Sequence, residues 1–213
     1  MIRKRPKDTE LIHRLIEYQK PYYTVADLEH ILGLTRSSMY VTLNRLVKAG
    51  FLTRVRKNAY IPFMGSMDVP KIAMQAYFPS YLSFEAALAQ YGILSQVPYT
   101  QTFATTRPSK EMDIGFVAVE FHHLKPELFF GYRLENGLYV ATREKALLDQ
   151  LYLVSRGKSA VNIEELDLRE IHKATFEEYA TKFPPSMKPL IDTVTQYIGT
   201  TPITNKEKER ISW

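Results

Sequence analysis

Residues 35–48 carry side chains suited to nucleic-acid recognition. If this segment is helical, its outer face presents Arg36, Ser37, Tyr40, Val41, Asn44, Arg45 and Lys48. Cations bind phosphates, hydroxyl and amide groups hydrogen-bond to base edges, and a methyl-bearing side chain can contact thymine. The spacing therefore predicts a helix that lies in the major groove of double-stranded DNA.

A basic hairpin is predicted directly after this helix. Residues 51–56 alternate between apolar and polar side chains, as a half-buried strand does. Lys57 and Asn58 supply the turn, and the chain returns through Tyr60 and Ile61. The hairpin would present Arg54, Arg56 and Lys57 to the DNA backbone or to a minor groove.

Two helices joined by a tight turn would position these groups. Thr24 is placed to cap the first helix, and the glycine Gly33 is suited to ending it. Thr35 is expected to cap the second helix, and Gly50 to end it. The apolar residues of the two helices fall on one inward face: Val25, Leu28, Ile31, Leu32, Met39, Leu43, Leu46 and Val47. Helix, turn, helix and two-stranded wing together predict a winged helix-turn-helix, which favours transcription control.

The charge distribution supports the same interpretation. Residues 1–65 hold 12 Lys and Arg against 5 Asp and Glu, whereas the remaining residues hold 16 against 18. A basic module joined to a mildly acidic one fits polyanion binding by the first module only. Two alternatives stay open: some winged helices bind only proteins, and the run Arg3-Lys4-Arg5 is either an arm on the DNA backbone or a solvated segment.

Composition excludes several classes of protein. The chain has 213 residues and no cysteine, so it has no disulfide and no thiolate metal site. No window approaches the roughly 18 apolar residues of a membrane span, and the basic N-terminus is not followed by an apolar run. We expect a soluble cytoplasmic protein that does not interact with a membrane.

A second domain is predicted after a break at residues 63–70, which gives domains of 1–65 and 70–213. Helices are expected from Ser83 to Tyr91, from Thr142 to Gly157, within residues 163–183, and from Ser186 to Ile198. Ser83, Thr142 and Ser186 are expected to cap the helices that they begin. Strands are expected at 102–106, 116–121, 129–134 and 138–141, the last two flanking an Asn-Gly turn. The fold class is α+β, with a small, mostly antiparallel sheet flanked by helices.

Glu144, Lys145 and Asp149 are the residues of this second domain that invite a catalytic role. On a helix, Lys145 and Asp149 are four residues apart and adjacent, which a surface ion pair or a structural hydrogen bond also explains. His122 and His123 would point to opposite faces of a strand and make a poor metal site. No phosphate-binding loop, G-x-S-x-G or H-E-x-x-H motif occurs. We expect no cofactor, no metal and no catalysis, with a nucleic-acid enzyme as the least favoured alternative.

Two blocks of the second domain resemble a known family. The stretch from Tyr81 to Leu94 with Gln96-Val97-Pro98, and the stretch from Gly137 to Asp149, are similar to segments of the AbiEi antitoxins of abortive-infection, type IV toxin–antitoxin systems. The resemblance covers residues 10–157 approximately. It implies an N-terminal winged helix that binds inverted repeats and represses its own promoter. It also implies a C-terminal domain that counters a nucleotidyltransferase-like toxin without a stable complex. Within that domain, Glu144, Lys145 and Asp149 are candidates for a site that contacts the toxin or a toxin substrate.

The sequence thus favours a DNA-binding autorepressor and antitoxin that is not an enzyme. The alternative is a stand-alone winged-helix regulator whose second domain senses a ligand or a partner. Whether a dimer or two monomers would fill two half-sites stays open.

Overall fold

The computed structural model describes residues 7–18, 20, 22–62 and 68–199. The fold is α+β, as the sequence predicts. The chain divides into two compact units, Met1–Ala73 with Asp113–Val117, and Met74–Met112 with Ala118–Trp213. Arg3, Lys4 and Arg5, for which an arm was considered, lie outside the described residues.

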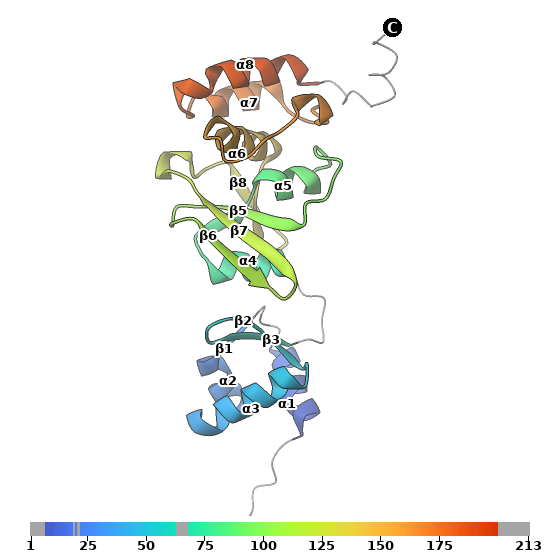
Figure 1. Cartoon of the computed structure of the whole chain (residues 1–213), viewed down its shortest axis with the longest axis vertical. Helices are drawn as coiled ribbons and strands as arrows, with labels where there is room; N and C mark the ends of the chain where they lie inside the picture. The colour runs from blue at the N-terminus through green and yellow to red at the C-terminus, as the bar shows by residue number, and fades with distance from the viewer. Residues whose placement is uncertain (1–6, 19, 21, 63–67, 200–213) are drawn as a thin grey trace, which may run out of the picture. The chain divides into compact units, whose positions relative to one another are not determined.

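The N-terminal unit contains three helices and a small antiparallel sheet (Figure 1). The helices are α1 (Asp8–Glu17), α2 (Val25–Leu32) and α3 (Arg36–Lys48), and the strands are β1 (Tyr23–Thr24), β2 (Leu52–Arg56) and β3 (Ala59–Pro62). The strand order is β1-β3-β2, and β3 pairs antiparallel with both neighbours. The expected hairpin is therefore present, while α1 and β1 were not predicted.

Apolar side chains of all three helices form one core. Buried residues of α1 (Leu11, Ile12, Leu15) meet those of α2 (Val25, Leu28, Leu32) and α3 (Met39, Leu43, Leu46). The inward face predicted for α3 is confirmed, except that Val47 and, on α2, Ile31 are only half-buried.

The two helix caps predicted in this unit have different outcomes. Thr24 forms a capping box with Asp27: the Thr24 hydroxyl accepts from the Asp27 N–H at 3.1 Å, and Asp27 accepts from the Thr24 N–H at 2.9 Å. Thr35 occupies the N-cap position of α3 but makes no side-chain cap. Its hydroxyl instead donates to the Ser38 hydroxyl at 3.1 Å.

A six-stranded sheet of order β6-β7-β5-β4-β9-β8 lies almost entirely in the second unit (Figure 1). The strands are β4 (Ser80–Leu82), β5 (Thr100–Thr105), β6 (Lys110–Ile114), β7 (Val117–His123), β8 (Tyr132–Glu135) and β9 (Leu138–Ala141). β4 pairs antiparallel with β5, and β8 with β9, whereas β5–β7 and β4–β9 are parallel.

The sheet is mixed, because β5–β7 and β4–β9 are parallel, so the expectation of a mostly antiparallel sheet holds only in part. β6 separates β5 from β7 in the chain but lies at the edge of the sheet, so β5 and β7 run side by side in one direction. β4 and β6 were missed because the first has three residues and the second is largely polar and exposed.

Helices cover the sheet and extend beyond it. The helices are α4 (Val69–Ala76), α5 (Phe84–Gln90), α6 (Arg143–Ser155), α7 (Lys173–Ala180) and α8 (Lys188–Tyr197). The short 3-10 turns are η1 (Pro126–Leu128), η2 (Ile163–Glu165) and η3 (Pro185–Met187). The boundary between the two units falls within α4. Figure 1 shows α6 between the sheet and the pair α7–α8. Consequently α6 is enclosed from several sides, and nine of its residues are buried.

Three caps were predicted for these helices. Thr142 caps α6 by accepting from the Lys145 N–H at 3.4 Å, as expected. Ser83 occupies the N-cap position of α5, but its hydroxyl is bonded elsewhere. Ser186 lies in η3, and α8 begins at Lys188 with Met187 as N-cap. Across the described residues, no helix has the length and apolar character needed to cross a membrane.

Candidate functional site

The outer face of α3 is the first candidate site. Arg36, Ser37, Tyr40, Val41, Asn44 and Lys48 are exposed, as the helical spacing predicts, while Arg45 is half-buried. Tyr40 is 41% exposed and Val41 60% exposed. Large apolar groups on a surface are informative when they lie within a polar face, because they mark a place where a partner can exclude water.

The two arginines of this face differ in their surroundings. The Arg45 guanidinium forms an ion pair with Asp8 of α1 at 2.6 Å. Arg36 is 76% exposed, and its Nε lies 3.9 Å from Glu29, a separation at which an exposed pair contributes little. Arg45 thus connects α3 to α1, whereas Arg36 remains accessible to an external partner.

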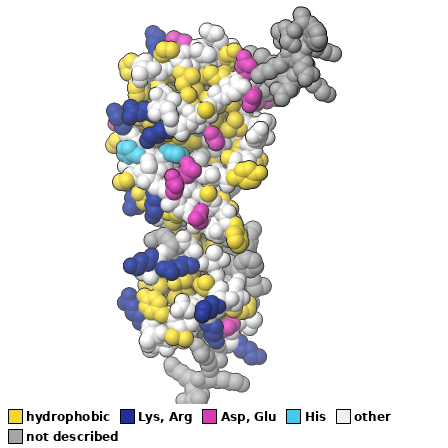
Figure 2. All heavy atoms as spheres, in the orientation of Figure 1, with side chains coloured by type: hydrophobic (Ala, Val, Ile, Leu, Met, Phe, Trp, Pro, Cys, Tyr) yellow, Lys and Arg dark blue, Asp and Glu magenta, His cyan; other side chains and the backbone are white. Residues whose placement is uncertain are grey.

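The β2–β3 hairpin adds further basic groups to the N-terminal unit. Lys57 and Asn58 are exposed at its turn, and Asn58 adopts a positive φ of 63°, which asparagine tolerates better than most residues. Arg54 is also exposed, and the side chain of Arg56 lies outside the described residues. Figure 2 shows basic side chains at several places on the visible face of this unit, among apolar ones.

Lys145 and Asp149 form the second candidate site, a polar network inside the second unit. Both side chains are fully buried, and the Lys145 Nζ donates to Asp149 Oδ1. Asp149 Oδ2 accepts from the Tyr81 hydroxyl at 3.0 Å and from the Ser83 hydroxyl at 2.7 Å. The pair is not on the surface, so of the two structural explanations considered, the surface ion pair is wrong.

Aromatic rings surround the ammonium group of Lys145. Its Nζ lies 5.5 Å from the ring centroid of Tyr81, 5.1 Å from that of Phe130 and 5.2 Å from that of Phe183. Rings at this distance attract a cation through their negative faces. The ring faces supply no hydrogen-bond acceptor, so the interaction with Asp149 offsets most of the free-energy cost of burying the ammonium group.

Burial shifts the pKa values of the network. It lowers the pKa of Lys145, against the attraction of Asp149, and it raises the pKa of Asp149, against Lys145 and the two hydroxyl donors. Burial and the nearby Asp149 also raise the pKa of Tyr81 well above its ordinary value, which keeps the phenol as a donor. Such shifts occur at active sites and in structural networks alike.

The neighbours of this pair on α6 also make structural contacts. Glu144 is buried, and its Oε1 accepts from the His172 N–H at 3.1 Å, directly before α7. Gln150 donates to Glu85 of α5 at 3.2 Å and to Ser159 at 2.9 Å. The three candidates Glu144, Lys145 and Asp149 therefore connect α6 to β4, α5 and α7.

Sequence reasoning missed Tyr81, Ser83 and Asp8 as partners. Tyr81 and Ser83 precede Asp149 by 68 and 66 residues, and no local pattern indicates such a pairing. Asp8 could have been found more easily, because Leu11, Ile12 and Leu15 have the spacing of an amphipathic helix beside α3.

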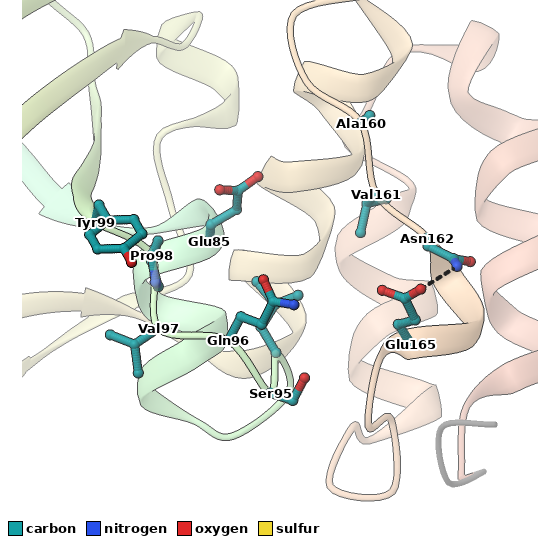
Figure 3. Close-up of a pocket in the computed structure, with 11 residues that line it drawn as sticks. Glu85, Ser95, Gln96, Val97, Pro98, Tyr99, Ala160, Val161, Asn162 and Glu165 are labelled. Atoms are coloured by element: carbon teal, nitrogen blue, oxygen red, sulfur yellow. Dashed lines mark hydrogen bonds between the residues drawn. The ribbon is translucent and has the colours of Figure 1, made fainter. Parts of the chain in front are cut away.

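A pocket of about 290 Å³ lies between the loop 94–99 and the segment 160–165. Figure 3 shows Glu85 and Gln96 on one side, with Val161 and Glu165 facing them from the other. Asn162 donates to Glu165 at 2.8 Å. The described lining residues include two carboxylates and neither lysine nor arginine, so the pocket favours cationic or neutral molecules.

The histidines do not form a metal site. His122 packs edge-on against Phe84, with ring centroids 5.0 Å apart. Nδ1 of the exposed His123 lies 3.0 Å from the carbonyl oxygen of Arg107. Burial lowers the pKa of His122, with a smaller contribution from Lys158. Within the part of the chain that the structure describes, no group of three or more potential ligands could hold a metal ion.

Comparison with protein-family models and with curated protein sequences finds no match to this chain. The functional interpretation therefore depends on the residues themselves.

Proposed function

We propose that this chain is a winged helix-turn-helix DNA-binding autorepressor that acts as the antitoxin of a type IV toxin–antitoxin system. The observation that carries the proposal is the outer face of α3. Six adjacent polar and apolar side chains are exposed there, while the opposite face is packed into the core. A helix of this kind, followed by a two-stranded hairpin with exposed cations, is what we expect of a winged helix, and it supports the proposal.

The residues have separate expected roles on DNA. Ser37, Tyr40, Val41 and Asn44 would contact base edges, and Arg36 at the first residue of α3 would bind a phosphate. Lys48, Arg54, Arg56 and Lys57 would bind phosphates, because cationic side chains release counterions from the duplex when they bind it. Arg45 would contribute less than the sequence predicts, since Asp8 already holds its guanidinium.

Gel shifts with the DNA upstream of the gene test this assignment. Asn44→Ala should lower affinity for that DNA and leave affinity for random DNA almost unchanged. Lys57→Ala should weaken both alike and reduce the salt slope of log affinity, expected near −5 for about six phosphate contacts, by about one. The matched control is Lys173→Ala, an exposed lysine of α7. If Asn44→Ala also lost affinity equally for both DNAs, as Lys57→Ala should, the assignment would be overturned.

The antitoxin part of the proposal rests on the AbiEi-like segments within residues 81–98 and 137–149. The partner would be a nucleotidyltransferase-like toxin encoded next to this chain, countered without a stable complex and without catalysis. Co-expression of the neighbouring gene with and without this chain tests it. Survival that depends on this chain supports the proposal. Toxicity that this chain does not relieve overturns the antitoxin part and leaves the DNA-binding part intact.

The pocket near Glu85 favours a second candidate function, a stand-alone regulator whose second unit senses a small amine. Glu85 and Glu165 would bind the ammonium group, and Val97 and Val161 would contact its apolar part. Thermal-shift titrations with tyramine and butylamine, using Glu165→Gln as the variant, test it. A shift in wild type that the variant loses supports sensing, and no shift with either amine overturns it.

A further inference from the structure

The middle of α3 contains one cation, Arg45, and its ion pair with Asp8 bears on which bases α3 would read. Tyr40, Val41 and Asn44 are exposed near the middle of the helix, on neighbouring turns of one face. Arg45 is the only cation among the central residues of α3, and Asp8 binds it at 2.6 Å. The remaining cations of α3 are Arg36 at its first residue and Lys48 at its last.

The spacing of these two cations fits contacts with the two walls of a groove. Arg36 and Lys48 are separated by 12 residues, which corresponds to a rise of about 18 Å along the helix. A major groove is about 12 Å wide, so a helix of this length would lie along the groove, and the long side chains at its two ends can reach phosphates beside it. The neutral middle of the helix would then face the base edges.

From this arrangement we propose that the centre of each operator half-site consists of A·T base pairs, with Asn44 reading an adenine and Val41 contacting the C5-methyl group of a thymine. The inference rests on the proposed DNA binding and adds its base preference. Guanine is most often read by the paired donors of an arginine or lysine, which the centre of α3 does not provide. An asparagine amide matches the donor and acceptor of adenine, and an apolar side chain matches the methyl group that only thymine carries.

The contact between Val41 and thymine is the most direct to test, because the C5-methyl group of the thymine can be removed without any other change to the DNA. Its side chain is 60% exposed, so Val41→Ala should leave the fold intact. Replacing the contacted thymine by uracil removes only the C5-methyl group. Since one buried methyl group is worth about fourfold in affinity, this replacement should weaken wild type by about that factor. The same replacement should leave the Val41→Ala variant unchanged.

The experiment begins with selection of a random duplex library by the full chain, followed by gel shifts on the selected site with uracil placed at one thymine at a time. Asn44→Ala should relax the preference at one A·T position by about tenfold, the range of one bidentate base contact. Lys48→Ala is the matched control, because it should weaken all selected and random sites alike and keep the uracil effect.

The outcomes separate this inference from the proposal on which it rests. A·T centres together with a uracil effect that disappears in Val41→Ala support it. Specific binding to sites with G·C centres overturns the base preference and leaves DNA binding standing. A uracil effect that persists in Val41→Ala overturns the contact by Val41. Absence of any DNA binding overturns both proposals.

Discussion

Replacing Asp149 by asparagine should expose the energetic role of the buried Lys145–Asp149 pair. The amide oxygen of asparagine can still accept from the Tyr81 and Ser83 hydroxyls, as Asp149 Oδ2 does at 3.0 and 2.7 Å. The charge that balances Lys145 is lost, however, and only three aromatic rings remain around the ammonium group. Breaking a buried ion pair from one side costs about 3–5 kcal/mol.

The protonation of Lys145 sets an upper limit on this loss. The variant can deprotonate Lys145 in the folded state, which at pH 7.5 costs about 4 kcal/mol relative to an ordinary lysine pKa of about 10.4. A folded-state pKa below the unfolded one means that the unfolded chain binds more protons, so stability rises with pH in that interval. Asp149→Asn should therefore regain about 1.4 kcal/mol per pH unit between pH 7.5 and about 10.

The partner variant Lys145→Met should show the opposite slope. Without the ammonium group, burial raises the pKa of Asp149 further, since Lys145 opposes that rise more than the Ser83 and Tyr81 hydroxyls do. A carboxyl group whose pKa is raised in the folded state loses stability as pH increases from about 4 towards that pKa. Lys145→Met should thus be least destabilised at acidic pH.

Urea denaturation followed by far-UV circular dichroism measures these changes, and hydrogen exchange of α6 peptides assigns them to the second unit. Asp192→Asn and Lys173→Met, at exposed positions, are the matched controls. The double variant should lose at least 2 kcal/mol less than the sum of the two single variants, because the groups are in direct contact. Losses below about 1 kcal/mol, additive effects, or equal pH slopes would refute the reasoning.

Three further variants test other parts of the structure. Gly131→Ala should destabilise the second unit by about 1–3 kcal/mol in urea denaturation, because Gly131 has a φ of +68° and an added Cβ would lie 3.1 Å from the Lys145 side chain; an unchanged midpoint would contradict this. Burial lowers the folded-state pKa of His122, so this residue should reduce stability as the pH falls below about 6.5. His122→Gln should make the melting temperature depend less on pH in that range, and an unchanged pH dependence would count against burial as the cause. Thr24→Ala removes the cap of α2 and should cost about 1 kcal/mol. Burial raises the pKa of Asp27, but hydrogen bonds from Lys20 and Thr24 outweigh it and lower that pKa. The stability that ionised Asp27 contributes should therefore disappear below about pH 4. An acid-unfolding transition that is the same in Thr24→Ala and wild type would contradict this.

Much of the N-terminal unit could be predicted from its sequence. The inward and outward faces of α3 follow from the periodicity of its apolar residues, and the structure buries Met39, Leu43 and Leu46 accordingly. The positive φ of Gly33 and of Gly50 follows from glycine's freedom at helix ends. The Asn136-Gly137 turn likewise joins β8 to β9 as its residue types predict.

The second unit was less predictable because its important contacts are distant in sequence. A spacing of four residues indicates that Lys145 and Asp149 are adjacent, yet it cannot distinguish a solvated pair from a buried one. Tyr81 and Ser83 reach Asp149 only because β4 and α5 pack against α6. The hydroxyl of Ser83, expected to cap a helix, is recruited by that carboxylate instead.

By itself, the sequence determined the local features of this protein: helix faces, turns, the position of a basic segment and the α+β class. These depend on periodicity and on backbone preferences within a few residues. Only the tertiary structure decided that Asp8 binds Arg45, that the sheet is mixed, and that an ion pair lies in the interior. Strand order and desolvation are set by segments far apart in the chain, so no local pattern contains them.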